Sequence, residues 1–239
     1  MGQTFDVAII GGGIAGFSLA HYLGANRKVL ILEQEDAFGY HATARSAAEF
    51  AFRFHTPLVG KLAALSFPFL NNPPQGFSAV QLLRERGMIL IASEEKRARL
   101  DEVLATESAK TDRLRRFSRD EVLAAAPILN PDFFASAFFD PDCWDIEADA
   151  LFQGFRKSAS ANGTVAISKA RVASAERKSG YWQIDTHSGQ FEAAVVVNAS
   201  GAWADQTAVL FGAAPLAHAP LNRTMITVDI PVGIDWRSM

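Results

Sequence analysis

Residues 5–33 constrain the chain most, because they predict a strand, a glycine-rich turn, a helix and a second strand in immediate succession. The apolar run 5–10 leads directly into Gly11, Gly13 and Gly16, which fill the three positions of a G-x-G-x-x-G pattern. The first glycine permits the tight turn, the second lets a pyrophosphate approach the backbone, and the third lets helix and strand pack closely. The stretch therefore predicts a dinucleotide site with its phosphates at a helix N-terminus.

Glu33 supplies the second half of this signature. It ends the second predicted strand, 28–33, about twenty residues after the glycines, where a carboxylate accepts the hydroxyls of an adenosine ribose and repels a 2′-phosphate. A glycine-rich turn without a ligand is the alternative reading, and the register of strand, helix, strand and carboxylate argues against it. The pattern leaves open whether the dinucleotide is NAD or FAD.

Composition restricts the class of protein. The chain has 239 residues, of which 49% are hydrophobic and 21% charged, as in an ordinary globular protein with one large or two small domains. A net charge of −3 gives no support to nucleic-acid binding. The single cysteine, Cys143, excludes an intramolecular disulfide, and the five histidines show no paired ligand spacing, so no metal is expected. No signal peptide or membrane-spanning run is evident, and we expect a cytoplasmic protein.

The loop after Glu33 is a second candidate for phosphate contact. Its small and polar residues predict a helix that opens at about Thr43 and continues through Ala47 and Ala48, with Arg45 as a possible charged donor. An ordinary helix cap with a surface arginine is the simpler reading.

The remaining pattern predicts alternating helices and strands. A hairpin is expected between 82–84 and 88–91, and Ser118 with Glu121 forms a capping box. The basic run 113–119 reads as solvated helix ends. Further helices are expected at 57–70, 93–106, 148–161 and 202–212, and strands at 164–167, 170–177, 181–186 and 190–198.

The last predicted strand carries the apolar run 193–198, which is typical of a sheet covered on both faces. The small-residue turn 199–201 that follows is another place where backbone meets the nucleotide. The chain then reaches a strand-like stretch at 224–228 and stops without a closing helix, which indicates an interrupted domain.

Several of these pieces together resemble the FAD-dependent D-amino-acid oxidase and glycine oxidase superfamily. They are the glycine motif with Glu33, the loop 39–48, the stretch 145–154 and the segment 196–203. Within this superfamily, the sequences at 39–41, 45–48, 72–74 and 149–151 are most similar to bacterial D-arginine dehydrogenase-like proteins.

The resemblance implies an α/β fold: a glutathione-reductase-like, FAD-binding Rossmann domain with an interleaved mixed-sheet substrate domain, here incomplete. The implied FAD domain comprises 1–76 and 146–212, and the substrate domain 77–145 and the start of its second part at 213–239. Family members continue through further substrate-domain strands and a second glycine-rich segment, which this sequence does not contain.

The resemblance also implies FAD as cofactor. The glycine loop and Glu33 would hold the adenosine diphosphate, Arg45 and Ser46 would lie near the pyrophosphate and flavin, and Val172 would offer backbone atoms to the adenine. The implied cofactor-binding set is Gly11, Gly13, Ile14, Ala15, Gly16, Glu33, Gln34, His41, Thr43, Arg45, Ser46, Ala47, Ala48, Val172, Asn198, Ala199, Ser200, Gly201 and Trp203.

For the substrate side, the resemblance places Glu49 and Phe54 where D-arginine dehydrogenases carry a histidine and a tyrosine facing the flavin. Arg223 lies where the family places an arginine that clamps a substrate carboxylate. The guanidinium-binding glutamate of those enzymes falls at or beside Gly87. A basic substrate would therefore lose its counter-ion, which argues against D-arginine.

The function that follows is oxidation of the C–N bond of an amino acid or similar amine to an imine, with hydride transfer to flavin N5 and an unidentified electron acceptor. Two alternatives stay open at this point. One is a non-catalytic or incomplete FAD-binding fragment, and the other is an NAD-dependent dehydrogenase, which leaves the loop 39–48 and the turn 198–201 unexplained.

Overall fold

The computed structural model describes residues 3–54, 56–222, 224, 229 and 233. The chain forms two compact units. The first unit comprises Met1–Ala48, Asn72–Leu82 and Glu147–Asn222, and the second comprises Glu49–Asn71, Leu83–Ile146 and Arg223–Met239. Residues 49–71 thus group with the second unit, whereas the sequence assigns them to the FAD domain. The domain boundaries drawn from the sequence stay a prediction for the complete architecture.

A mixed six-stranded sheet forms the centre of the first unit, with strand order β10-β11-β12-β1-β2-β9. β12, β1, β2 and β9 run parallel, and β10 and β11 join antiparallel. This mixed sheet confirms the expected α/β class. The bounds are β1 (Thr4–Ile10), β2 (Val29–Leu32), β9 (Val165–Ile167), β10 (Val172–Lys178), β11 (Tyr181–Thr186) and β12 (Gly189–Asn198).

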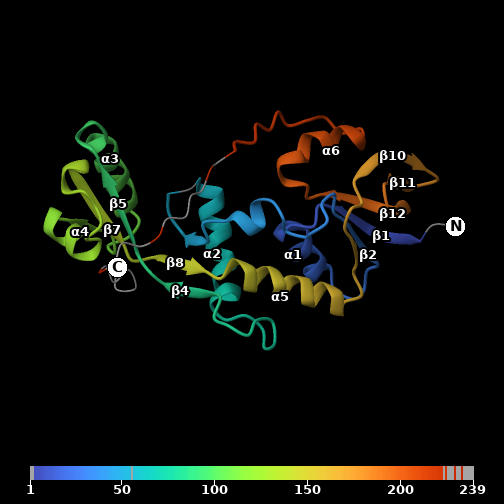
Figure 1. Cartoon of the computed structure of the whole chain (residues 1–239), viewed down its shortest axis with the longest axis horizontal. Helices are drawn as coiled ribbons and strands as arrows, with labels where there is room; N and C mark the ends of the chain where they lie inside the picture. Colours follow the sequence, from blue (N-terminus) through green and yellow to red (C-terminus); the bar gives the residue numbers. More distant parts are fainter. Residues whose placement is uncertain (1–2, 55, 223, 225–228, 230–232, 234–239) are drawn as a thin grey trace. The chain divides into compact units, whose positions relative to one another are not determined.

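Three helices accompany this sheet: α1 (Ile14–Leu23), α5 (Ala148–Ala161) and α6 (Ala204–Leu210). α1 packs along α5, as Figure 1 shows, while α6 contacts β10 and β12. A core cluster of Phe5, Ala8, Ile10, Leu30 and Leu32 fills one side of the sheet, joined by Ala170, Val172, Ile184 and Ala193. β1 and β2 are largely buried because their apolar side chains alternate between two packed faces, whereas β9 and β12 are partly exposed.

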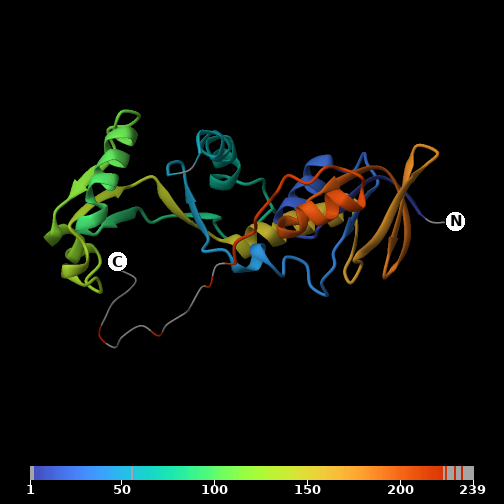
Figure 2. The same cartoon turned by 90° about the horizontal axis from the view of Figure 1, so that it is seen from above.

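The second unit contains two three-stranded sheets, β3-β8-β4 and β5-β7-β6. Figures 1 and 2 show α3 and α4 beside the strands of the second of these sheets. The strands are β3 (Glu49–Ala51), β4 (Leu83–Glu85), β5 (Met88–Ala92), β6 (Arg115–Phe117), β7 (Ser136–Asp140) and β8 (Cys143–Ile146). The helices are α2 (Pro57–Asn71), α3 (Arg97–Ser108) and α4 (Arg119–Ala125).

The hairpin expected around residues 85–87 is wrong. β4 pairs with β8, and β5 pairs with β7, so the two strands belong to different sheets. Between them, the N–H groups of Arg86 and Gly87 both donate to the carbonyl of Cys143, at 3.2 and 3.0 Å. These two bonds hold the backbone between β4 and β5 against Cys143. Pairing with the distant strands β8 and β7 therefore replaces the local hairpin.

The helix expected from Thr43 through Ala48 is also wrong in its extent. A single 3-10 turn covers Ala42–Arg45, and Ala48 lies in the left-handed region at φ 58°. The strand β3 begins at the next residue and pairs with β8. Strand pairing therefore overrides the helix propensity of the alanines, which is only a weak preference.

The basic run 113–119 forms a helix end only at Arg119, which begins α4. Arg115–Phe117 is the edge strand β6, which pairs with β7. Its charges meet carboxylates: Arg113 contacts Asp142 at 2.9 Å, and Arg116 contacts Asp101 at 2.9 Å. The capping box, in contrast, is confirmed, with Ser118 and Glu121 exchanging hydrogen bonds.

The apolar run 193–198 is less covered than its sequence suggests. Ala193 is fully buried, but Val195 is 51% exposed. The expectation of a strand covered on both faces is therefore wrong for the described residues. In the described part of the chain, no helix is both long and apolar enough to cross a bilayer.

A buried ion cluster fixes the end of β7. Arg53 donates to both carboxylate oxygens of Asp140, at 2.9 and 2.8 Å, and also to Asp142. The side chain of Asp140 is fully buried, and Arg53 is only 13% exposed. Burial alone would lower the pKa of Arg53, but the two carboxylates outweigh it and raise the pKa, so the guanidinium stays charged.

We expect Arg53→Met to destabilise the protein by about 3–5 kcal/mol, because it leaves a buried carboxylate without its cation. Arg97→Met, which breaks an exposed pair with Glu94, should cost less than about 1 kcal/mol. Urea unfolding of both variants measures the difference. Equal stabilities would show that the cluster contributes nothing.

Glu121 gives a pH-dependent prediction. The backbone N–H of Ser118, together with Arg115 and the Ser118 hydroxyl, lowers the pKa of Glu121 from 4.5 to about 2. A lowered acid pKa means that this cap contributes its full stability above about pH 4.5 and loses it as the pH falls toward 2. Arg115→Met should raise the Glu121 pKa in an NMR carboxyl titration, while Arg99→Met should not.

Candidate functional site

The glycine turn after β1 lies in close backbone contact with the turn after β12. Gly11 has φ +115°, and its N–H donates to the carbonyl of Leu32 at 2.9 Å. A Cβ at Gly11 would overlap the carbonyl oxygen of Ala199, and a Cβ at Gly16 would overlap the carbonyl oxygen of Gly11. Because Gly11 carries no side chain, the β1–α1 turn can lie in contact with the turn after β12. The sequence predicts such a close approach of backbone for a nucleotide site. We call these two turns, with Glu33 and Thr43, the nucleotide cradle.

Glu33 lies directly after β2, and only 8% of it is exposed. One carboxylate oxygen accepts the N–H of Gly12 at 2.8 Å, and the other accepts the N–H of Glu35 at 3.0 Å. Both partners are backbone groups, and no cation of the described residues pairs with the carboxylate, so its charge is oriented without being neutralised. A carboxylate has further lone pairs, which can accept ribose hydroxyls beside the turn.

The N-terminus of α1 follows the turn, as anion binding requires. Its N-cap residue, Gly13, makes no side-chain cap. The N–H of Ile14 instead donates to the hydroxyl of Thr43 at 3.0 Å. The hydroxyl therefore lies at the positive end of the helix, where a phosphate is favoured.

The loop 34–48 holds several of the predicted cofactor residues near one another. His41 Nε2 lies 2.9 Å from a carboxylate oxygen of Glu35, and its ring centroid lies 4.5 Å from that of Trp203. This contact brings the loop against the turn after β12. Arg45 is exposed and lies over the Tyr40 ring at 4.9 Å. The same loop contains Gln34, Ser46, Ala47 and Ala48, with the Ser46 hydroxyl accepting the N–H of Ala48 at 3.0 Å.

The turn after β12 is held by a polar network. Asn198 donates to the Ala204 carbonyl at 2.7 Å and accepts the Ser200 hydroxyl at 2.7 Å, and that hydroxyl lies 2.8 Å from the hydroxyl of Thr207. These contacts fix the backbone of 198–201 next to Gly11.

The start of β10 lies beside Glu33. The N–H of Ala170 donates to the backbone carbonyl of Glu33 at 2.7 Å, and the buried Val172 follows two residues later. The position of Val172 is therefore compatible with the adenine contact that the resemblance implies, and that role stays a prediction.

The sequence analysis missed two residues that pack beside the glycine turn, Phe38 and Arg156. A Cβ on Gly12 would lie 2.6 Å from the ring of Phe38, so this phenylalanine packs directly against the glycine backbone. Arg156 lies over the rings of Phe17, Phe38 and Phe152, at 5.3 to 5.7 Å. Neither residue belongs to a recognisable motif, since a phenylalanine in a loop and an arginine on a helix carry no positional signal.

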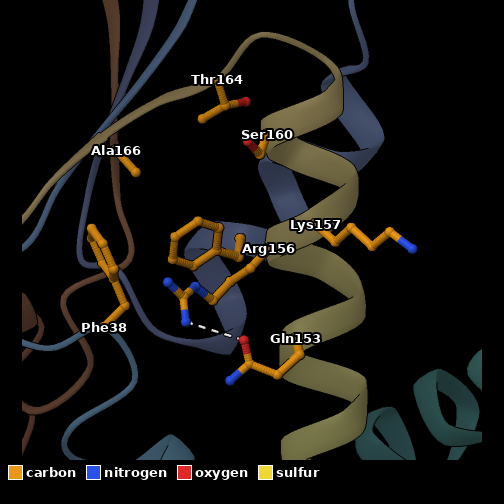
Figure 3. A pocket seen from close by; sticks show the side chains of 8 residues that line it. Phe38, Gln153, Arg156, Lys157, Ser160, Thr164 and Ala166 are labelled. Atoms are coloured by element: carbon orange, nitrogen blue, oxygen red, sulfur yellow. Dashed lines mark hydrogen bonds between the residues drawn. The ribbon is translucent and has the colours of Figure 1, made fainter. Parts of the chain in front are cut away.

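Phe17, Phe38 and Arg156 line a pocket of about 530 Å³. Figure 3 shows the Arg156 guanidinium near Phe38 and hydrogen-bonded to Gln153, while Lys157 points away. Ser160, Thr164 and Ala166 complete the wall. The pocket thus exposes part of the aromatic cluster on which the glycine turn rests.

The predicted substrate-side residues belong to the second unit, as far as the structure describes them. Glu49 begins β3 and pairs with Arg86 at 2.9 Å, and Arg86 also contacts Asp145 at 3.0 Å. Burial alone would lower the pKa of Arg86, but its anionic neighbours raise it. The sequence analysis gave Arg86 no role because it lies in the expected hairpin turn.

Phe54 has φ 68°, and its ring lies 5.7 Å from that of Phe138. The interpretation of Gly87 as lacking a substrate counter-ion stays a prediction; a Cβ there would lie 2.5 Å from the Phe139 ring. Cys143 is buried, and burial together with Glu49 raises the pKa of its thiol, which keeps it neutral. Arg223 lies outside the described residues.

Comparison with known proteins agrees with the geometry of the first unit. Residues 6–237 match the DAO family of FAD-dependent oxidoreductases. Glycine oxidase of Geobacillus kaustophilus is 26% identical over 97% of this chain and 63% of its own length. The bovine FAD-dependent oxidoreductase domain-containing protein 1 is 26% identical over 95% of this chain and 53% of its own.

Solved structures give the same result. The crystal structure of the Geobacillus glycine oxidase superposes with a TM-score of 0.78 at 25% identity, covering 88% of this chain and 59% of that one. Glycine oxidase from Bacillus cereus superposes with a TM-score of 0.74 at 26% identity, covering 87% of this chain and 58% of that one.

The chain therefore spans between about half and two thirds of the length of these relatives. The match nevertheless covers nearly all of its own residues, including the glycine turn, Glu33 and the turn after β12. The chain belongs to the family of FAD-dependent oxidoreductases, whose cofactor is FAD.

Proposed function

We propose that this chain forms the FAD-binding part of an oxidoreductase that oxidises the C–N bond of a small amino acid or amine to an imine. The observation that carries the proposal is the buried Glu33 carboxylate, oriented by the Gly12 N–H at 2.8 Å beside a turn that excludes side chains. Family membership supports FAD over NAD as the ligand of this arrangement.

Each part of the cradle has a separate task in this proposal. Glu33 accepts the ribose hydroxyls, and the first N–H groups of α1 together with Thr43 face the pyrophosphate. The backbone of 198–201 closes the opposite side. The remaining members of the predicted set, from Gln34 to Ala48, keep their proposed roles around the phosphates and flavin.

When bound, FAD supplies the acceptor for a hydride from the substrate α-carbon. The protein then has to orient the amine and keep it uncharged. For this we propose the substrate-side set Glu49, Phe54 and Arg223. Because Arg86 already pairs with Glu49 at 2.9 Å, the carboxylate is compensated within the second unit. The Glu49 carboxylate is therefore a weak binding site for the positively charged side chain of a basic substrate.

For the substrate class we propose a small, neutral D-amino acid, glycine or an N-methylated relative. The names of the relatives support a small amine, since they include glycine oxidases and a rat dimethylglycine dehydrogenase. D-arginine fits poorly, because Gly87 offers no carboxylate at the position where D-arginine dehydrogenases place one. A cytoplasmic location completes the proposal, and the electron acceptor stays unidentified.

Cofactor binding is tested first. Purified protein titrated with FAD should show a bound-flavin spectrum, and heating should release the flavin. Gly11→Ala should abolish uptake, because the added Cβ overlaps the Ala199 carbonyl and φ is +115°. Glu33→Gln should weaken FAD binding about 10- to 100-fold, the equivalent of a hydrogen bond to a charged group.

Glu176→Gln, which removes an exposed carboxylate paired with Lys178 in the same unit, is the matched control and should not change FAD affinity. Uptake of a nicotinamide cofactor in place of flavin would overturn the choice of FAD. Equal FAD affinity in Glu33→Gln and the parent would remove Glu33 from the ribose site.

Substrate oxidation is tested on the FAD-loaded protein without oxygen. We expect glycine, sarcosine or D-alanine to bleach the flavin, and D-arginine to do so at least about tenfold more slowly, since one charged contact is missing. L-Alanine serves as the stereochemical control. A protein that binds FAD but is bleached by none of these amines is instead a non-catalytic flavin-binding part.

A further inference from the structure

The pocket of Figure 3 lies between α5 and the strand β9. Among the described strands of the first sheet, β9 is last in the order and pairs with β2 alone. Ile167 of this strand packs on the apolar core cluster. Because side chains alternate along a strand, Ala166 faces the other way, toward α5. We call this space the α5 pocket, formed by residues 153–160 of α5, by Thr164 and Ala166, and by two phenylalanines.

The α5 pocket is separate from the nucleotide cradle. The backbone N–H of Glu33, in the cradle, donates to the carbonyl of Ile167 at the end of β9, at 2.9 Å. Thr164 lies just before the first residue of that strand, so the pocket extends away from the cradle along β9. Phe38 stands between the two, because it lines the pocket and also packs against Gly12. A ligand in the α5 pocket therefore leaves the cradle free for FAD.

Arg156 places a positive charge in the pocket. Its guanidinium lies over the rings of Phe17 and Phe38, at 5.7 and 5.3 Å. Aromatic rings hold a guanidinium by its face and leave its N–H groups free for an acceptor. Gln153 accepts one of them at 3.1 Å, and no carboxylate of the described residues pairs with Arg156. The remaining N–H groups suit a carboxylate, which a guanidinium binds through two parallel hydrogen bonds.

The other end of the pocket carries two hydroxyl groups. Figure 3 shows Ser160 and Thr164 at the end away from the Arg156 guanidinium, with Phe38 and Ala166 along the wall between. Within the described part of the chain, neither hydroxyl has a hydrogen-bond partner. The pocket thus offers a cation, an apolar wall and hydroxyl groups in succession.

This arrangement defines a class of ligand. Lys157 points away in Figure 3, and none of the residues that line the pocket is acidic, so the charge that faces it is the single guanidinium of Arg156. One guanidinium balances a monoanion, and 530 Å³ lies within the range of about 300–1,000 Å³ that is usual for small-molecule sites. We propose that the α5 pocket binds a small aryl carboxylate. The carboxylate lies on Arg156, the ring lies along the apolar wall, and a polar group of the ligand meets the two hydroxyls.

The probe is 3-(4-hydroxyphenyl)propanoate, titrated into the chain with saturating FAD and followed by NMR. We expect saturable shifts of the Arg156 Nε–H signal and of the Thr164 and Ala166 amides, with a Kd on the order of 1 mM for a ligand of this size. 4-Ethylphenol, which lacks the carboxylate, should bind at least about tenfold more weakly. 3-Phenylpropanoate, which lacks the hydroxyl, should bind about two- to tenfold more weakly.

Variants of two neighbouring cations on α5 make the test specific. Arg156→Met should weaken binding of the probe at least about tenfold, because it removes the partner of the carboxylate. Lys157→Met is the matched control and should leave the Kd unchanged, since Lys157 points away from the pocket.

A third variant leaves the support of the aromatic rings intact. Thr164→Val keeps the shape of the side chain and removes a hydroxyl. It should reduce the preference for the hydroxylated probe over 3-phenylpropanoate without affecting the requirement for a carboxylate.

Four results would overturn the proposal. Displacement of the probe by FAD would place it in the nucleotide cradle, and shifts confined to the second unit would place it there. Equal binding to Arg156→Met and the parent would remove the guanidinium from the site. Acetate that binds as tightly as the probe would show that the apolar wall contributes nothing. The proposal goes beyond the oxidation of amines, and because binding is measured without turnover, each result is independent of that activity.

Discussion

The close contact between Gly11 and the carbonyl of Ala199 is the constraint on which the rest of the first unit depends. It joins the ends of β1 and β12, two strands that lie far apart in the sequence, at the edge where a nucleotide would bind. The geometry leaves no room for a side chain at Gly11. The N-terminus of α1, the Thr43 hydroxyl and the turn 198–201 all take their positions from this contact.

The buried carboxylates of the two units have different partners: Asp140 pairs with a cation, whereas Glu33 accepts backbone N–H groups. Asp140 is neutralised by Arg53, and such a pair serves structure because neither charge is available to a ligand. Among the residues that the structure describes, Glu33 accepts only backbone N–H groups, so its charge is oriented but not cancelled. A carboxylate that has to receive a hydroxyl group is better prepared in the second way.

The sequence predicted the parts whose signal is local. The glycine turn, the capping box at Ser118 and α5 all depend on nearby residues, and the structure confirms these local features. The roles predicted for the glycines and Glu33 toward the cofactor stay predictions. The family, the α/β fold and FAD also followed from the sequence, through motifs spread over the whole chain.

What the sequence did not predict depends on distant partners. The hairpin at 85–87 failed because Cys143, far along the chain, binds both turn amides. The helix at 43–48 gave way to a strand paired with β8. Phe38 and Arg156 carry no spacing signal, since their importance lies in a packing contact with Gly12 and its neighbours. The catalytic set stays a prediction, because its members lie in the second unit or outside the described residues.

The long connection between β1 and β12 also has a consequence for biosynthesis. Thr4 lies opposite Glu192, so the nucleotide turn cannot close until the ribosome has released some two hundred residues. At about 5–20 residues per second, this leaves β1 without β12, its partner on one side, for roughly 10–40 s. The second unit, with β4 to β8 between residues 83 and 146, emerges within that interval. Chaperone demand during translation should therefore fall mainly on the apolar strands β1 and β2.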